Sequence, residues 1–344
     1  MFFASDNSGP VHPEVLDLMA QSNTGFAMAY GADPMMDEVR TRLRDVFEAP
    51  EASIHLVATG TAANSLALAT LCQPYETVFC SPVAHIHEDE CNAPEFYTGG
   101  AKLTLVAGGD KMTPEALSAS IAGEGVRGVH GPQRGPVSIT QVTERGSVYT
   151  LNELRDLCSV AKGYDLPVHL DGARFANAMV VLGCTPAEMT WKAGVDAVSF
   201  GGTKNGLMGV EAVIFFDPAH AWEFELRRKR GAHLFSKHRY LSAQMAGYLR
   251  DDLWIRSARA ANANAARLAD GLRAKGAEFL HHPDANMIFV AFPRFRHQAL
   301  FAKGAMYNLW GGKLEGDPDE MLACRLVCDW SISHDQIDAF LDMI

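Results

Sequence analysis

Short apolar runs alternate with amphipathic stretches along the chain as far as residue 217. The apolar runs predict β-strands at residues 53–57, 77–80, 102–106, 126–130, 167–170, 195–200 and 210–216. The stretches between them predict helices, such as residues 62–71, 113–122 and 150–162. This alternation is typical of an α/β fold with a mainly parallel sheet and helices on both of its faces.

The pattern changes after Asp217-Pro218. Long helices are predicted at residues 219–229, 236–249 and 255–275, followed by strands near 287–292, 305–310 and 322–328 and a final helix at 334–343. We therefore expect an N-terminal arm (1–33) with one short helix near 14–21, a large α/β domain (34–217), connecting helices (218–275) and a small α+β domain (276–344). The arm is expected to pack over the large domain or over a neighbouring subunit.

Composition narrows the classes of partner. The chain has 344 residues, of which 48% are apolar and 21% charged, as is typical of a globular protein with a deep core. Its 30 Lys and Arg residues against 41 Asp and Glu residues give a net charge of −11. Because surplus negative charge opposes attraction to phosphate backbones and anionic lipids, we expect neither nucleic acid nor a membrane as a partner.

The first residues and the cysteines bear on the cellular compartment. Residues 1–6 lack the basic and long apolar regions of a secretion signal, and no later run approaches the ~18 apolar residues of a membrane span. We therefore expect a cytoplasmic protein. The seven cysteines form no CxxC pair, so we expect no disulfide framework or zinc knuckle. Cys324 and Cys328 are expected to be buried thiols on one face of a strand.

Three turns that follow predicted strands carry residues suited to chemistry. In the first, Thr59-Gly60-Thr61 precedes a predicted helix. Backbone N–H groups at a helix start, a glycine and a hydroxyl can together bind an anion. The same residues are also typical of a plain turn with a helix N-cap.

The second turn begins at Asp171, which ends the apolar run 167–170 and is followed by Gly172 and Arg174. Ligands of parallel α/β sheets collect at the carboxyl ends of strands, so Asp171 stands where a binding residue is expected. The alternative is a helix-capping aspartate with Arg174 as its local ion-pair partner.

The third turn, Gly201-Gly202-Thr203-Lys204, contains one lysine. A lysine desolvated among glycines can act as an amine nucleophile, whereas a surface lysine is the alternative. Lys204, Asp171 and the Gly60-Thr61 turn together supply the amine, the pyridinium partner and the phosphate cradle that pyridoxal phosphate requires. The combination is more specific than any of its members.

A longer ordered set of motifs resembles the L-threonine aldolases, which are pyridoxal-phosphate enzymes of fold type I. The set is Tyr30-Gly31-Ala32-Asp33-Pro34, Thr59-Gly60-Thr61-Ala62-Ala63-Asn64, Ala84-His85, His169-Leu170-Asp171-Gly172-Ala173-Arg174 and Thr203-Lys204-Asn205-Gly206. The likeness extends over essentially the whole chain. Around Lys204 the sequence is similar to low-specificity threonine and phenylserine aldolases.

The resemblance implies how a cofactor would be held. Lys204 would form the Schiff base, Asp171 would keep the pyridine nitrogen protonated, and Gly60 and Thr61 would hold the phosphate. His85 would stack on the ring, although its neighbours in the run 85–90 are polar and would otherwise be interpreted as exposed.

The resemblance also implies how a substrate would be held. Arg174 would contact the phenolic oxygen of the cofactor, and Arg325, with Ser5, would bind the substrate carboxylate, which suits the planar fork of an arginine. Without the resemblance, Arg325 would be interpreted as an edge-strand residue with its charged end in water. The implied reaction is retro-aldol cleavage of L-threonine, L-allo-threonine or a related β-hydroxy-α-amino acid such as phenylserine, to glycine and an aldehyde.

Two departures from the family leave roles open. Related aldolases often carry a Thr-His-Asn-Gly stretch whose histidine contacts the substrate hydroxyl, whereas this chain has Thr143-Glu144-Arg145-Gly146. We therefore expect His85 to act as the general base, with Glu144 and His87 as alternatives.

The second departure concerns the phosphate. Ser236 stands where relatives place a phosphate-binding arginine, and Lys229, Lys237 or Arg239 could replace it. The cluster 227–230, which includes Lys229, is otherwise interpreted as a solvated helix end. Family members build their active sites from two subunits, with Tyr30 reaching across, which implies a homodimer and favours a homotetramer.

Other functions remain alternatives. Another fold type I pyridoxal-phosphate enzyme, either a β-eliminating lyase or an aminotransferase, would share the same three groups. A non-catalytic binding protein of this fold could lose the lysine, but this chain retains Lys204. A metal-dependent aldolase is disfavoured because the 13 histidines form no compact ligand set, and we expect no metal.

Overall fold

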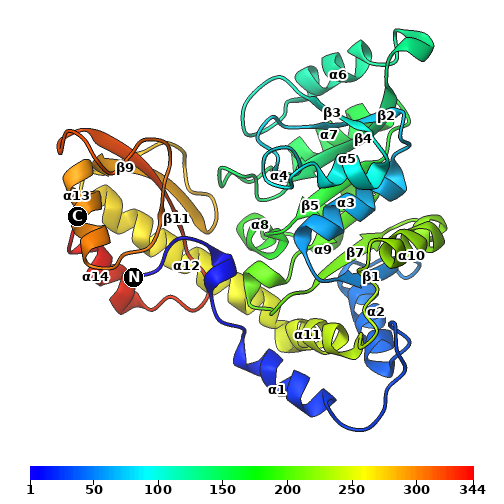
Figure 1. Ribbon diagram of the computed structural model, residues 1–344, viewed down its shortest axis with the longest axis horizontal. Helices are drawn as coiled ribbons and strands as arrows, with labels where there is room; N and C mark the ends of the chain where they lie inside the picture. The colour runs from blue at the N-terminus through cyan, green and yellow to red at the C-terminus, as the bar shows by residue number, and fades with distance from the viewer.

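The computed structural model describes residues 1–344, which form two lobes, each built around its own sheet (Figure 1). The strands are β1 (Ser53–Val57), β2 (Glu76–Cys80), β3 (Lys102–Leu105), β4 (Gln133–Thr140), β5 (Val168–Gly172), β6 (Ala197–Phe200), β7 (Glu211–Phe215), β8 (Glu278–Phe279), β9 (Met287–Pro293), β10 (Asn308–Leu309) and β11 (Met321–Val327). The first seven make the sheet of the larger lobe, and the last four make that of the smaller lobe.

The larger sheet has the strand order β1-β7-β6-β5-β4-β2-β3. Strand β7 runs antiparallel to its neighbours β1 and β6, and the remaining pairs are parallel. The expected mainly parallel α/β sheet is therefore confirmed. The smaller sheet, in the order β10-β11-β9-β8, is antiparallel throughout.

One predicted strand was wrong. The chain forms a turn at residues 126–127 and a short 3-10 helix at Gly128–His130, and β4 begins only at Gln133. Gly125 and Gly128 take positive φ values of 74° and 54°, which interrupt an extended backbone. Val126 and Val129 are exposed, so the apolar residues that suggested the strand have no core to face.

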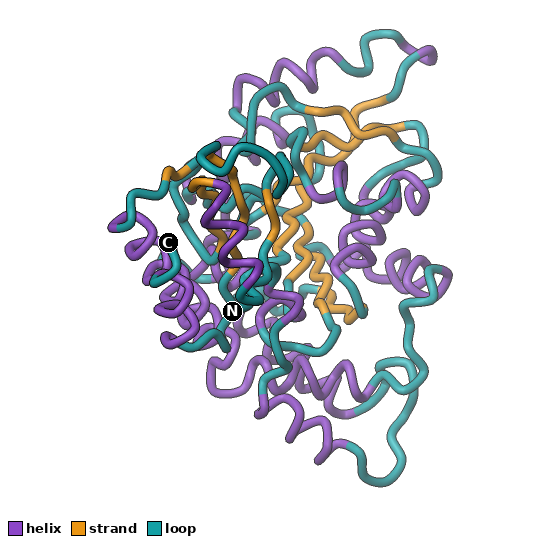
Figure 2. The backbone as a smooth tube through the Cα atoms, turned by 60° about the vertical axis from the view of Figure 1, so that its left-hand side comes forward, coloured by secondary structure: helices purple, strands orange, loops and turns teal.

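The helices lie on both faces of the larger sheet (Figure 2). They are α1 (Pro13–Ser22), α2 (Pro34–Val46), α3 (Gly60–Leu71), α4 (His85–Glu88), α5 (Ala93–Thr98), α6 (Pro114–Gly123), α7 (Leu151–Lys162), α8 (Phe175–Leu182), α9 (Pro186–Met189), α10 (Ala221–Arg230), α11 (Arg239–Leu249), α12 (Leu253–Ala274), α13 (Arg294–Ala302) and α14 (His334–Leu341). Helix α3 contacts α5, α10 and the strands β6 and β7, whereas α8 contacts β5 and α12.

Side chains alternate between the two faces, as the two-residue period of a strand requires. In β7, Val213 and Phe215 pack with the apolar residues of α3, whereas Ala212 and Ile214 belong to the main core on the opposite face. Both faces of the central strands are therefore buried, which explains their continuous apolar runs.

Helix α12 joins the two lobes. Trp254 and Ala258 near its start belong to the main core, and Leu268 and Leu272 near its end belong to the core of the smaller lobe. The N-terminal residues join the smaller lobe, where the Phe3 N–H donates to the carbonyl of Met306 at 2.7 Å. Helix α1 packs on α11. The domain boundaries at residues 33, 217 and 275 stay predictions.

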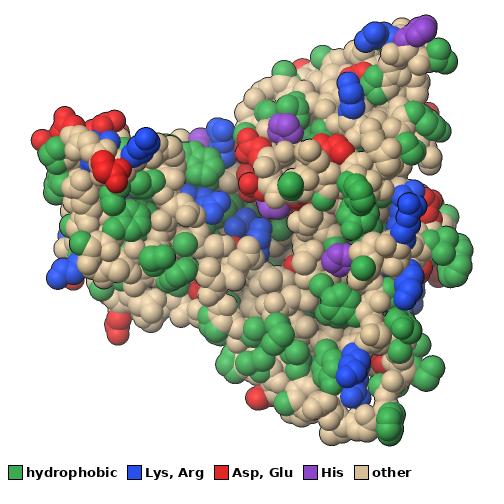
Figure 3. Space-filling model, in the orientation of Figure 1, with side chains coloured by type: hydrophobic (Ala, Val, Ile, Leu, Met, Phe, Trp, Pro, Cys, Tyr) green, Lys and Arg blue, Asp and Glu red, His purple; other side chains and the backbone are tan.

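The topology brings several loops to one place. Because β1, β2, β4, β5 and β6 point the same way, their carboxyl ends meet at one edge of the sheet. Figure 3 shows a hollow between the two lobes with Lys and Arg side chains exposed in it. No helix of the protein is long and apolar enough to cross a membrane.

Candidate functional site

A cavity of about 360 Å³ opens at the carboxyl edge of the larger sheet. It brings together Gly60, Thr61, His85, Asp171 and Lys204, all of which the sequence analysis selected. These residues lie at or beyond the carboxyl ends of four different strands, so only the parallel topology makes them neighbours.

The first wall of the cavity is the start of α3. The Thr59 side chain caps this helix by accepting a hydrogen bond from the Ala62 N–H at 3.2 Å. Open space surrounds the position that a Cβ of Gly60 would occupy. The other N–H groups of the first turn, which Thr59 does not cap, therefore remain available to an anion. The turn is thus compatible with both interpretations, a helix N-cap and an anion site.

Asp171 lies on β5 and is buried. Its Oδ1 accepts from the Ala173 N–H at 3.1 Å, and its Oδ2 accepts from Asn64 Nδ2 at 3.0 Å. Beneath it, His169 lies 3.0 Å from the hydroxyl oxygens of both Ser138 and Ser199, which joins β5 to its two neighbours. Burial lowers the pKa of His169 to about 4, so this imidazole is a neutral structural group.

The turn that carries Lys204 is fixed on both sides. Before it, the Gly202 N–H donates to Glu211 at 2.6 Å, and burial raises the pKa of that carboxyl although its hydrogen bonds and Lys204 oppose the rise. After it, Asn205 donates to the Tyr248 hydroxyl at 2.7 Å and to the Trp254 carbonyl at 2.8 Å. Lys204 is therefore presented to the cavity by a rigid turn.

The structure corrects the interpretation that the polar residues beside His85 in the run 85–90 are all exposed. His87, Glu88 and Asp89 are exposed as expected, but Glu90 is buried and lines the same cavity as His85. His85 Nδ1 lies 2.9 Å from Glu90 Oε1. Burial opposes the charged imidazole, but the hydrogen bond to Glu90 and the nearby carboxylates outweigh burial and raise the pKa of His85.

Arg174 does not pair with Asp171, so the hypothesis of a local ion pair was wrong. Its Nε and Nη2 donate to the two carboxylate oxygens of Asp6 at 2.7 and 3.0 Å, and both side chains are buried. Asp6 follows Ser5, whose hydroxyl caps the next turn by accepting from the Asn7 N–H. Asn286 also donates to Asp6 at 3.1 Å.

Arg325 lies on β11, opposite Phe289 of β9. It does not line the cavity, and its Nε is buried without a hydrogen-bond partner. Burial and the positive charge of Arg174 lower the pKa of Arg325, while Glu144 and Asp6 oppose this. The Arg325 guanidinium, in the smaller lobe, is therefore influenced by Asp6 and Glu144, which also act on Arg174 in the larger lobe.

Tyr30 lies outside the cavity. It is half exposed, its N–H donates to the Ser236 carbonyl at 3.2 Å, and Lys229 Nζ lies 4.8 Å above its ring. Glu144 lines a small neighbouring cavity. Arg239 donates to the carbonyls of Thr24 and Gly25, so its guanidinium is engaged away from the site.

The cluster 227–230 is not wholly a solvated helix end. Lys229 and Arg230 are exposed, but Arg228 is buried and donates to Glu225 at 2.8 Å and to the Leu56 carbonyl at 3.0 Å. The sequence showed no sign of this pairing beyond the spacing of three residues between Glu225 and Arg228.

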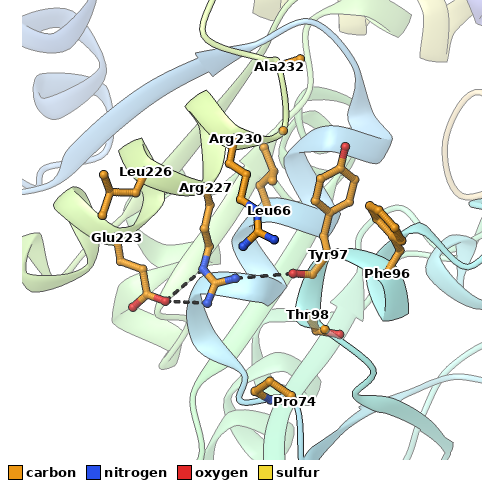
Figure 4. A pocket seen from close by; sticks show the side chains of 12 residues that line it. Leu66, Pro74, Phe96, Tyr97, Thr98, Glu223, Leu226, Arg227, Arg230 and Ala232 are labelled. Atoms are coloured by element: carbon orange, nitrogen blue, oxygen red, sulfur yellow. Dashed lines mark hydrogen bonds and ion pairs between the residues drawn. The ribbon is translucent and has the colours of Figure 1, made fainter.

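A larger cavity of about 770 Å³ lies elsewhere, between α3, α5 and α10. Figure 4 shows Phe96 and Tyr97 on one side of it and Arg227 held by Glu223 and by the Tyr97 carbonyl on the other. Arg227 and Arg230 of the cluster 227–230 line it, but none of the residues proposed for catalysis, cofactor binding or substrate binding does. The candidate site is therefore the smaller cavity, where the amine, carboxylate and helix start converge.

The fold and this cavity define a fold type I α/β protein with a site of the pyridoxal-phosphate type. A model of the beta-eliminating lyase family matches residues 3–293. The low specificity L-threonine aldolase of Pseudomonas sp. (strain NCIMB 10558) is 40% identical over 97% of this chain and 94% of its own length. The chain therefore belongs to the beta-eliminating lyase family and to the family of the low specificity L-threonine aldolases.

Solved structures agree with this assignment. The Leishmania major threonine aldolase superposes with a TM-score of 0.91 at 26% identity, covering 99% of this chain and 97% of its own. A serine palmitoyltransferase from S. paucimobilis with bound PLP has a TM-score of 0.70 at 19% identity, covering 100% of this chain and 86% of its own. The second likeness concerns the fold alone.

The residues present fit pyridoxal phosphate. A lysine, a carboxylate and a helix N-terminus border one cavity, which matches the aldehyde, the ring nitrogen and the phosphate of that molecule. Two buried oxygens at the same cavity, Asn64 Oδ1 and Glu90 Oε2, have no hydrogen-bond partner within the protein.

Sequence reasoning gave no role to four residues that the structure links to the site: Asp6, Asn64, Glu90 and Glu211. Asn64 belongs to the family motif that begins at Thr59, so its position was visible and its contact was not. For the other three residues, no local sequence pattern indicates which groups they contact.

Proposed function

We propose that this protein is a pyridoxal-phosphate-dependent lyase that cleaves L-threonine, L-allo-threonine or related β-hydroxy-α-amino acids, such as phenylserine, to glycine and an aldehyde. The family membership and the names of its relatives support this. The observation that carries it is the convergence of Lys204, Asp171 and the Gly60-Thr61 turn on one cavity.

Each side of the cavity takes one part of the cofactor. When bound, pyridoxal phosphate supplies an aldehyde that condenses with amines and a protonated ring that takes up the electron pair of the breaking bond. Lys204 Nζ is the amine that holds the aldehyde. Asp171 would accept a hydrogen bond from the protonated ring nitrogen and keep it protonated, and Gly60 and Thr61 would bind the phosphate through the start of α3. His85 stacks against the ring.

Two arginines have separate roles, Arg174 toward the cofactor and Arg325 toward the substrate. Arg174 uses Nε and Nη2 for Asp6, which leaves Nη1 for the phenolic oxygen of the cofactor. Arg325 has an unpartnered buried Nε and, with Ser5, binds the substrate carboxylate. Holding the carboxylate would fix the orientation of the substrate at Cα, and this orientation would select the Cα–Cβ bond for cleavage.

His85 is the proposed general base. It takes the proton of the β-hydroxyl at Nε2, directly or through a water, as the Cα–Cβ bond breaks and the aldehyde leaves. A proton then returns to Cα to complete glycine. Glu144 is the second candidate because its charge acts on both His85 and Arg325. His87 is exposed and is the weakest of the three.

A second subunit completes the site in this proposal. Tyr30 and Lys229, which contact one another outside the cavity of their own chain, reach the site of a neighbouring chain. Lys229 is the favoured replacement for the missing phosphate arginine, ahead of Lys237 and Arg239. The protein is accordingly a homo-oligomer in this proposal, and we favour a homotetramer that is a dimer of dimers. We also propose that it is cytoplasmic.

Product analysis tests the function. Purified protein with added cofactor is incubated with L-threonine and with L-phenylserine, and the products are quantified by chromatography. Glycine and the aldehyde are expected in equal amounts, and Lys204→Ala is expected to abolish both. Ammonia with a keto acid would instead identify a β-eliminating lyase, and a keto acid with an aminated cofactor would identify an aminotransferase.

A further inference from the structure

A second buried carboxylate, Glu90, lies next to Asp171 in the cavity. Glu90 follows α4 in a loop, and its side chain is fully buried, although the residues on both sides of it, Asp89 and Cys91, are exposed. A carboxylate removed from water in this way requires partners, because burial of an unpaired charge is costly. Its partners are the two groups that face the cofactor site.

Glu90 is the centre of a continuous chain of hydrogen bonds. One oxygen, Oε1, lies 2.9 Å from His85 Nδ1 and accepts from Asn64 Nδ2 at 2.9 Å. The same Asn64 nitrogen donates to Asp171 Oδ2 at 3.0 Å. The chain His85–Glu90–Asn64–Asp171 thus joins three separate elements, α4 with its following loop, α3 and β5.

Several charged groups face His85 from the surrounding elements. Glu90 and Asp171 are linked to it by this chain, Glu144 acts on it from the loop after β4, and Lys204 and Glu211 line the same cavity. Of these groups, only Glu90 contacts the imidazole directly. On its own helix, the neighbouring His87 and Glu88 are exposed.

We propose that Glu90 is a positioning residue, which holds the His85 imidazole by its Nδ1–H and, through Asn64, ties the orientation of that ring to Asp171. The inference rests on the proposed function, in which His85 stacks on the cofactor and acts as the base. With Nδ1 committed to Glu90, the proton moves on and off His85 at Nε2 alone.

Two consequences follow from this arrangement. His85 is the first residue of the short helix α4. While Glu90 holds its Nδ1, the imidazole cannot turn about its side-chain bonds, so the orientation of the ring toward the cavity stays fixed. The charge of Glu90 also stabilises the imidazolium form, so the neutral form that acts as base appears at a higher pH than it would alone. The direction agrees with the raised pKa of His85.

The first test is the pH profile of kcat/KM for threonine cleavage in Glu90→Gln. The amide keeps the shape of the side chain but removes its charge. Since a nearby opposite charge changes a pKa by about 1–3 pH units, the acidic limb of the profile is expected to move to lower pH by about one unit. A loss of activity that is equal at every pH would overturn the proposal, because it would show a purely structural role.

The control is Glu225→Gln, which breaks a similar carboxylate–histidine pair outside the cavity, where His55 Nδ1 lies 2.8 Å from Glu225. This variant is expected to lower stability, because it also removes the partner of buried Arg228, and to leave the acidic limb unchanged. A limb that moved equally in both variants would contradict a specific role for Glu90.

The second test needs no variant at Glu90 and no turnover. The holoenzyme is prepared with isotope-labelled histidine, and the His85 signal is identified by its loss in His85→Asn. Above its pKa, wild-type His85 is expected to be protonated at Nδ1 and unprotonated at Nε2, as seen from its ¹⁵N chemical shifts. The opposite tautomer would overturn the proposal even if Glu90→Gln failed to fold.

The outcomes separate the two proposals. If the wild type forms no glycine from threonine, the proposed function fails, whereas the tautomer of His85 still reports on Glu90. If the wild type cleaves threonine but His85 carries its proton at Nε2, the proposed function stands and the role of Glu90 fails.

Discussion

At the scale of single residues, the ion pair between Asp6 and Arg174 connects the first residues of the chain to the site. The two side chains are 1% and 7% exposed, and Asn286 from the smaller lobe donates to the same carboxylate. Burial alone would raise the pKa of Asp6, but Arg174, Lys204 and the hydrogen bonds lower it. The carboxylate therefore stays charged at neutral pH and binds the edge of the Arg174 guanidinium that carries Nε and Nη2.

We expect Asp6→Asn to lower the free energy of unfolding by about 3–5 kcal/mol, because it leaves a buried guanidinium without a counter-charge. Urea denaturation at pH 7 measures this. Glu14→Gln, which removes the exposed partner of Arg256, is the control and should change stability by less than about 1 kcal/mol. Equal effects of the two substitutions would show that burial of the Asp6 pair has no energetic consequence.

The stabilising effect of Asp6 also depends on pH. Because its folded pKa lies below the unfolded value, its contribution is present above the unfolded pKa of about 3.9 and is lost as pH falls through the folded pKa. The difference in stability between the wild type and Asp6→Asn is therefore expected to shrink in acid.

At the scale of elements, the turn that carries Lys204 approaches the end of β5 closely. A Cβ on Gly201 would lie 2.7 Å from the carbonyl carbon of Ala173 and 2.8 Å from the Gly172 carbonyl oxygen. Only glycine allows this approach of two backbones. The spacing between Asp171 and Lys204 therefore depends on the absence of a side chain at residue 201.

We expect Gly201→Ala to cost about 1–3 kcal/mol of stability and to weaken cofactor binding, because the two turns must move apart. Urea denaturation and titration with pyridoxal phosphate measure the two effects. Gly123→Ala, at the end of α6 with no atom near its Cβ position, is the control and should be neutral or slightly stabilising. Unchanged cofactor binding in Gly201→Ala would contradict the account of this turn.

The elements differ in how far the sequence predicted them. The buried strands were found from their continuous apolar runs, and the amphipathic helices α7 and α12 from their strong helical periodicity. Helix α6 has a weaker period, but Thr113 and Pro114 mark its start. Helix α8 was missed because it is apolar on nearly all sides, between β5 and α12, and gives no helical period. The false strand at 126–130 shows the opposite error, in which apolar residues stand on an exposed turn.

At the scale of the whole molecule, exposed apolar side chains bear on the proposed assembly. Phe26 is fully exposed and Met28 largely so, on the segment between α1 and α2. This segment lies beside residues 235–240, because Arg239 donates to the carbonyl of Gly25 and Tyr30 donates to that of Ser236. Such a group of exposed apolar residues is typical of a surface between subunits.

We expect light scattering on the wild type to give the mass of four chains. The double variant Phe26→Ser and Met28→Ser should form smaller species, because it removes the apolar area that a neighbouring chain would cover. Val129→Ser, which changes an exposed residue on a distant turn, is the control and should leave the mass unchanged. A monomeric wild type would contradict the proposed assembly.

The sequence predicted the part of the site that lies in local motifs. Asp171, Lys204 and Gly60 lie at or a few residues beyond the carboxyl ends of predicted strands, so the parallel topology implied that they meet. Asp6 and Glu90 were not predicted as site residues, because their partners lie far away in the sequence or in another element. Nothing in the sequence near Asp6 indicates that it pairs with Arg174. Glu90 stands among polar residues that are exposed, so the sequence does not show that Glu90 alone of them is buried.

Locating the cofactor on the chain tests the central claim most directly. The holoenzyme is treated with sodium borohydride, which makes a lysine–pyridoxal linkage permanent, and is then digested and analysed by mass spectrometry. The account predicts a pyridoxyl group on Lys204 and on no other lysine. A pyridoxyl group on a different lysine, or none on a protein that has been loaded with cofactor, would contradict it.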